Sequence, residues 1–109
     1  MKTMFAILIL AVSMMAYAFD ALDAPHRYVV ERTFPKGALA GLDAAAKEKV
    51  NTTNARFGVH WVMSYANQDE TKTFCIYEAP NEDAIRAAAK ANSIPVDAIT
   101  EVPVTLESH

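Results

Sequence analysis

The fold is decided by residues 59–91, VHWVMSYANQDETKTFCIYEAPNEDAIRAAAKA. Two runs rich in aromatic and β-branched residues, 59–66 and 71–79, are joined by a short polar segment, which is the pattern of a β-hairpin. A helix is predicted over residues 82–91, because Asn81 is a suitable N-cap and two acidic residues follow it in the first turn. The stretch therefore predicts two antiparallel strands followed by a helix.

The flanking sequence extends this pattern in both directions. Residues 28–34 predict a first strand, and apolar residues at helical spacing predict a helix over 38–57, which Gly58 ends. A last strand is predicted over 99–106, where Pro103 is typical of an edge or interrupted strand. The order βαββαβ predicts a ferredoxin-like α+β sandwich, an antiparallel sheet with both helices on one face.

Residues 1–18 are predicted to be a cleavable secretory signal peptide. A lysine at the second position is followed by an unbroken apolar run and by an Ala-Tyr-Ala site that ends at Ala18. The apolar run is shorter than the roughly 20 residues that span a bilayer, so a membrane anchor is not expected. We expect cleavage after Ala18, a periplasmic or secreted chain, a flexible leader over 19–27 and one domain over 28–109.

Charge and cysteine content exclude further classes of protein. The net charge is -3 and the sequence has no run of Lys or Arg, so nucleic acid is not an expected ligand. Cys75 is the single cysteine, which excludes an intrachain disulfide. Because both helices lie on one face of the predicted sheet, the other face is bare and is most simply covered by a second copy. We therefore expect a homodimer.

The predicted hairpin assigns side chains to two faces, since side chains alternate along a strand. The more apolar set is expected under the helices and comprises Trp61, Met63, Tyr65, Phe74, Ile76 and Glu78. The opposite, bare face is expected to carry His60, Val62, Ser64, Thr73, Cys75 and Tyr77, joined by Glu31 and Thr33 from the first strand.

Four residues of the expected bare face carry groups that bind nickel, zinc or copper. They offer a carboxylate, an imidazole, a thiol and a phenol: Glu31, His60, Cys75 and Tyr77. No two of them stand at a recognised metal spacing. The alternative is structural: His60 is a surface or interface residue, Cys75 a small buried side chain, and Tyr77 an aromatic residue in the dimer contact. Arg32 is expected to form a structural ion pair with Glu78.

Several motifs resemble a known family. They are VERTFP at 30–35, W-x-x-S-Y at 61–65, KTFCIYEAPN at 72–81, AIR at 84–86 and IP at 94–95. The pattern runs from about Tyr28 to Val102 and is similar to the small nickel-binding-protein-like family, ferredoxin-like domains of unknown function. The resemblance implies a dimer that binds nickel at its surface and sequesters metal. Many relatives carry histidines where Met63 and, approximately, Ala88 stand here.

Three functions remain open from the sequence. The first is an exported metal-binding protein in which Cys75 and His60 ligate a divalent transition metal such as nickel. The second is a metal-free binding module whose dimer cavity, under Trp61, Tyr65 and Phe74, holds a small apolar ligand. The third is a cofactor-free enzyme of the dimeric α+β barrel type that uses a carboxylate or an imidazole, Glu31 or His60, as its base. Because no catalytic motif is specific enough to name a reaction, a binding protein is favoured over an enzyme.

Overall fold

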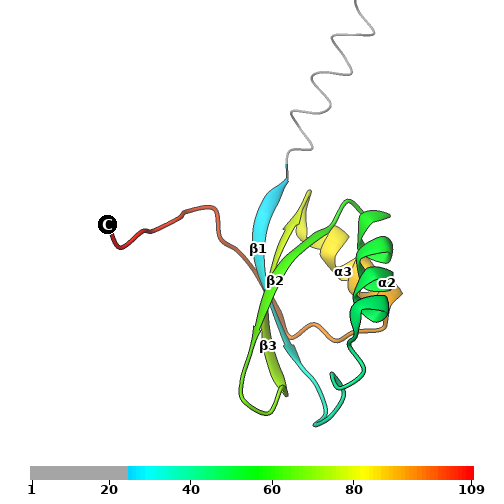
Figure 1. Ribbon diagram of the computed structural model, residues 1–109. Helices are drawn as coiled ribbons and strands as arrows, with labels where there is room; N and C mark the ends of the chain where they lie inside the picture. Colours follow the sequence, from blue (N-terminus) through cyan, green and yellow to red (C-terminus); the bar gives the residue numbers. More distant parts are fainter. Residues whose placement is uncertain (1–24) are drawn as a thin grey trace, which may run out of the picture.

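The computed structural model describes residues 25–109 (Figure 1). The predicted signal peptide and most of the predicted leader lie outside the described residues. The elements are β1 (His26–Thr33), α2 (Ala44–Ala55), β2 (His60–Ala66), β3 (Lys72–Ala79), α3 (Glu82–Asn92) and β4 (Ala98–Glu101).

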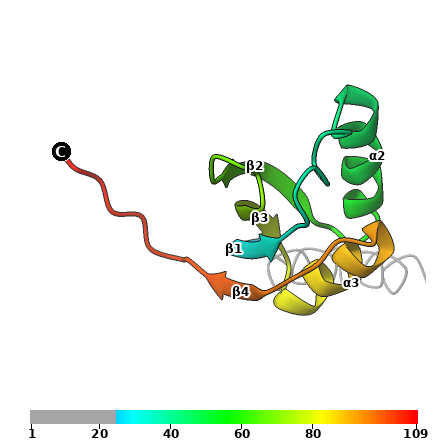
Figure 2. The same cartoon turned by 90° about the horizontal axis from the view of Figure 1, so that it is seen from below.

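The four strands form one antiparallel sheet in the order β2-β3-β1-β4. Both helices lie on the same side of this sheet, as the two perpendicular views show (Figures 1 and 2). The predicted ferredoxin-like α+β fold is therefore confirmed. Within residues 25–109, no helix is both long enough and apolar enough to cross a membrane.

The first helix is shorter than its apolar spacing predicted. It begins at Ala44, where the Asp43 side chain accepts a hydrogen bond from the Ala46 backbone N–H and acts as the N-cap. The preceding residues form successive turns from Lys36 onward, which include Gly37, whose φ of +84° favours glycine. The apolar residues 38–42 therefore lie in a loop rather than on a helix, and they are free to border a cavity beside α2.

Two strand limits also differ from the prediction. β1 begins at His26, which pairs with Ala79. The last two residues of the predicted leader, His26 and Arg27, therefore belong to the sheet. β4 ends at Glu101. The next residue, Val102, still donates its N–H to the carbonyl oxygen of Arg27. Pro103 has no N–H to continue the pairing, and the chain then runs away from the domain (Figures 1 and 2).

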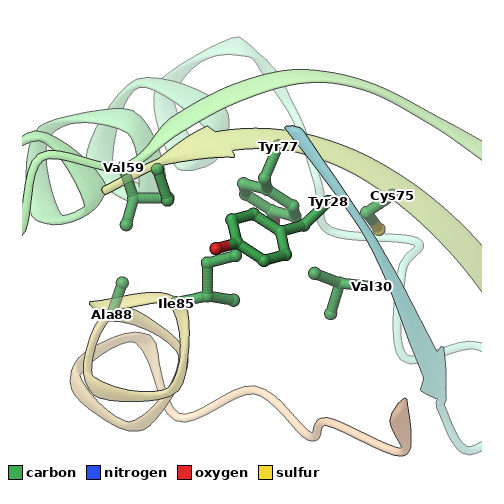
Figure 3. Close-up of a cluster of buried hydrophobic side chains, with 8 residues drawn as sticks. Tyr28, Val30, Val59, Cys75, Tyr77, Ile85 and Ala88 are labelled. Atoms are coloured by element: carbon green, nitrogen blue, oxygen red, sulfur yellow. The ribbon is translucent and has the colours of Figure 1, made fainter. Parts of the chain in front are cut away.

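The predicted assignment of the two sheet faces is wrong, because the more apolar set of hairpin residues is the exposed one. Tyr28 and Val30 of β1 pair with Tyr77 and Cys75 of β3, and all four side chains are buried on the helix side. Figure 3 shows them with Ile85 of α3 in one cluster. The opposite face is left open, and it exposes Met63, Tyr65 and Phe74.

A β-bulge in β2 adds a second departure from simple alternation. The register shifts between Trp61 and Met63, so Trp61 lies opposite Tyr77 whereas Met63 lies opposite Ile76. The bulge turns Trp61 toward the helices, where it packs against the core. It also places His60 opposite Glu78, on the open face rather than beside Cys75.

Candidate functional site

A cavity of about 570 Å³ lies between α2 and the helix side of the sheet. We call it the α2 pocket. Its floor consists of sheet residues that include Arg32, Trp61, Ser64, Thr73, Cys75 and Tyr77. Its roof consists of the loop before α2 and the first part of the helix, with Leu39, Leu42, Lys47, Val50 and Asn51. The floor is rich in polar groups, whereas the roof is mainly apolar.

Strand register brings the floor residues together. Arg32 of β1 lies opposite Thr73 of β3, and Ser64 of β2 lies opposite Cys75. Since Thr73 and Cys75 are two residues apart on one strand, they share a face with each other and with their partners. The bulge adds Trp61 to the same face, and its indole N–H donates to the Ser64 hydroxyl at 2.9 Å.

The central polar residue of the pocket is Arg32, which is only 3% exposed. Its Nη1 donates to the carbonyl oxygen of Pro95 at 2.6 Å, and its Nη2 donates to the Tyr77 hydroxyl at 3.3 Å. The guanidinium lies 5.6 Å from the centre of the Tyr77 ring. Its Nε is buried and has no hydrogen-bond partner among residues 25–109, and no carboxylate of these residues lies within ion-pair distance.

Tyr77 is almost fully buried beside Arg32 and stays a neutral phenol at neutral pH. Burial raises the pKa of Tyr77, and the positive charge of Arg32 opposes this rise in part. Because the phenol oxygen accepts a hydrogen bond from Arg32, its own hydrogen remains available to a further acceptor. Thr73 has a similar arrangement, since its hydroxyl oxygen accepts a hydrogen bond from the Cys75 thiol.

Asp97 is the acidic group whose charge acts on this region from the loop before β4. Its carboxylate accepts hydrogen bonds from the Thr33 hydroxyl and from Lys72 Nζ. These hydrogen bonds, and to a smaller extent the charge of Arg32, hold the pKa of Asp97 below its ordinary value. The carboxylate is therefore directed to Thr33 and Lys72, and it compensates the buried guanidinium only through space.

The structure does not bring the four predicted metal ligands together. Cys75 and Tyr77 lie buried on the helix side, whereas Glu31 and His60 lie on the open face. Glu31 is 3.8 Å from Lys72 Nζ, and His60 is exposed. In the part of the chain that the structure describes, no three His, Cys, Asp or Glu residues are placed to hold one metal ion.

Arg32 lines the pocket but was not among the site residues predicted from the sequence. It was expected to pair with Glu78, but Glu78 lies on the open face, where its carboxylate is 4.0 Å from Arg27 Nη2. The signal was present in the sequence: Arg32 stands two and four residues after the buried Val30 and Tyr28. A charged residue that continues the buried face of a strand is the feature that would have identified it.

Fold and pocket together define a small ferredoxin-like domain with a partly polar cavity beside its first helix. The chain matches the model of the family described as "Nickel responsive protein SCO4226-like" over residues 28–102, and it belongs to this family. The family resemblance inferred from the sequence motifs is thus confirmed.

A solved structure supports the same fold. It is the crystal structure of SCO4226 from Streptomyces coelicolor A3(2), which aligns with a TM-score of 0.54 and 15% sequence identity. The alignment covers 73% of this chain and 99% of that chain. No curated protein sequence matches the chain. At this level of identity the likeness concerns the fold, so function must be argued from the site itself.

Proposed function

We propose that this protein is a small binding protein whose ligand site is the α2 pocket. The observation that carries the proposal is the cavity, whose volume of about 570 Å³ is typical of small-molecule sites. Such sites are mostly apolar and contain a few convergent polar groups. Leu39, Leu42 and Val50 supply the apolar wall, and Arg32 and Tyr77 supply polar groups.

The packing of α2 explains why the pocket exists. Asn54, near the end of the helix, is its one buried residue, and its side-chain oxygen accepts a hydrogen bond from Asn92 of α3. The first part of α2 has no buried residue and borders the cavity through Lys47, Val50 and Asn51. The sheet beneath it is therefore incompletely covered by the chain itself, and an apolar ligand would cover it further.

A neutral apolar probe tests this function. We expect N-phenyl-1-naphthylamine to fluoresce more strongly on binding, and we expect Val50→Trp to weaken binding by about tenfold or more, because the larger side chain fills the pocket. Val104→Trp is the matched control, since Val104 is 72% exposed on the C-terminal segment. Equal binding by wild type and Val50→Trp, or no binding by wild type, would contradict the proposal.

Divalent metal binding is the second candidate, and the family description as nickel responsive favours it. His60 and Glu78 are directly opposed on the open face and offer an imidazole and a carboxylate. Two such groups are fewer than a complete coordination sphere, so water or a second copy of the chain would supply the other ligands. The Cys75 thiol offers a separate ligand inside the α2 pocket.

Calorimetric titration of nickel tests the metal candidate. We expect His60→Ala to weaken binding if the open face holds the metal, and Cys75→Ala to weaken it if the pocket does. Glu107→Ala, in the exposed C-terminal segment, is the control for nonspecific binding by surface carboxylates. The same affinity in wild type, His60→Ala and Cys75→Ala would remove both positions as metal sites.

The compartment of this function follows from the predicted signal peptide. We propose that the signal peptide is cleaved after Ala18 and that the mature protein binds its ligand in the periplasm or outside the cell. The apolar run and the Ala-Tyr-Ala site at residues 16–18 support this proposal.

A further inference from the structure

We propose that the α2 pocket recognises the carboxylate of a small organic acid through Arg32, while the apolar wall holds the hydrocarbon part of the acid. This inference rests on the proposed function of the pocket, and it adds the charge and chemical class of the ligand. The observation behind it is a buried cation that has no anionic partner among the described residues.

The charge of the buried guanidinium is the first reason to expect an anionic ligand. Arginine stays protonated in proteins, so Arg32 carries its charge although it is 3% exposed. A buried charge without a counterion is strongly unfavourable unless hydrogen bonds or an ion compensate it. Pro95 and Tyr77 satisfy part of the group, but both are neutral, and Nε has no partner. Asp97 acts on the guanidinium only through space, so a ligand carboxylate would supply both an acceptor for Nε and a negative charge in direct contact.

The geometry favours a carboxylate over other acceptors. Nε and Nη2 form one edge of the planar guanidinium, and two parallel N–H groups on such an edge match the two oxygens of a carboxylate. The Tyr77 hydroxyl accepts from Nη2 at 3.3 Å, and its own hydrogen is available to a ligand oxygen. Thr73, directly opposite Arg32 in the sheet, places a second hydroxyl on the same floor.

The other charged groups around the pocket are consistent with an anionic ligand. Lys47 of α2 and Glu70 of the β2–β3 turn also line the pocket. Asp97 is engaged by Thr33 and Lys72. The pocket wall therefore carries two cations and one anion. The apolar roof of Leu39, Leu42 and Val50 distinguishes an organic acid from inorganic phosphate, which would leave that roof uncovered.

A matched pair of probes tests the inference: octanoate, and octanamide, which is neutral and has the same chain length. Binding is followed by calorimetry and by the fluorescence of Trp61, the single tryptophan, which lines the pocket. We expect wild type to bind octanoate about tenfold or more tightly than octanamide, because a hydrogen bond between two charged groups is stronger than one to a neutral amide.

Substitutions then assign this preference to a residue. Arg32→Met is expected to abolish the preference for octanoate over octanamide. Arg32→Lys keeps the charge but loses the planar edge, so an intermediate preference is expected. Arg27→Met is the control, because Arg27 belongs to the same strand but pairs with Glu78 on the open face.

The outcomes separate this inference from the proposed function. If wild type binds octanamide as tightly as octanoate, the carboxylate inference fails and the binding function stands. If wild type binds neither probe and also fails to bind N-phenyl-1-naphthylamine, the proposed function fails. If inorganic phosphate displaces octanoate at equal concentration, the site is a general anion site and the organic-acid inference is overturned. The wild-type comparison decides the matter even if Arg32→Met does not fold.

Discussion

Replacing Ile85 with alanine tests the core on which the pocket is built. Ile85 is 1% exposed and, with Val30, is the largest fully buried side chain among residues 25–109. It lies between α3 and the sheet, close to Tyr28 and Tyr77 (Figure 3). The substitution removes three carbon groups, each about 0.8 kcal/mol of transfer free energy, and the cavity left behind adds to this loss. We expect the free energy of unfolding to fall by about 3 to 4 kcal/mol.

The matched control is Ile76→Ala, which removes the same atoms from the open face of the sheet. Ile76 is only partly buried, so a loss of roughly 1 kcal/mol or less is expected for a single chain. Urea unfolding followed by circular dichroism measures both values, and an unchanged m-value shows that the two states compared are the same. A loss at Ile85 below about 1 kcal/mol, or equal losses at Ile85 and Ile76 in a monomeric chain, would refute the assignment of the two faces.

Three further predictions concern the N-terminus, the open face and one acidic residue. Mass spectrometry of the exported protein is expected to show cleavage after Ala18, and an intact N-terminus would contradict it. Light scattering is expected to give a homodimer that Tyr65→Glu converts to monomer, because Tyr65 is 61% exposed on the open face; a monomeric wild type would refute this. The pKa of Asp97 is lowered in the folded state, so its contribution to stability is present above the unfolded pKa and is lost as pH falls through the folded pKa. Asp97→Asn should therefore be less stable than wild type near neutral pH and should approach it below about pH 4, and a constant difference would contradict the hydrogen bonds to Thr33 and Lys72.

The order of elements could be predicted because it is encoded locally. Alternation in 71–79, the Asn81 cap and the polar turn before Thr71 each depend on neighbouring residues alone. The start of α2 was harder to predict, because Leu39 and Leu42 continue the helical spacing although they lie in a loop. The N-cap Asp43 sets the start of α2 in the structure. In the sequence, the apolar spacing continues upstream of Asp43 and hides this cap.

The identity of the buried face could not be predicted from the hairpin. Phe74 and Ile76 are more apolar than Cys75 and Tyr77, so composition favours the wrong face of β3 as the buried one. The decision comes from pairing with β1, which is distant in sequence and contributes Val30 opposite Cys75. The bulge at Trp61 has no marker in the sequence, and it alone moves His60 away from the thiol.

The incomplete packing of α2 links the stability of the domain to its proposed function. The helix has no buried apolar residue, and this is the reason that a cavity remains between it and the floor around Arg32. A ligand that binds the native state alone stabilises it by RT ln(1 + [L]/Kd), about 2.7 kcal/mol at a free concentration about 100 times Kd. Octanoate should therefore raise the unfolding temperature of wild type, and Val50→Trp should remove most of this rise, since the indole occupies the same space. A ligand-induced rise of equal size in both proteins would show that octanoate stabilises the fold from another surface.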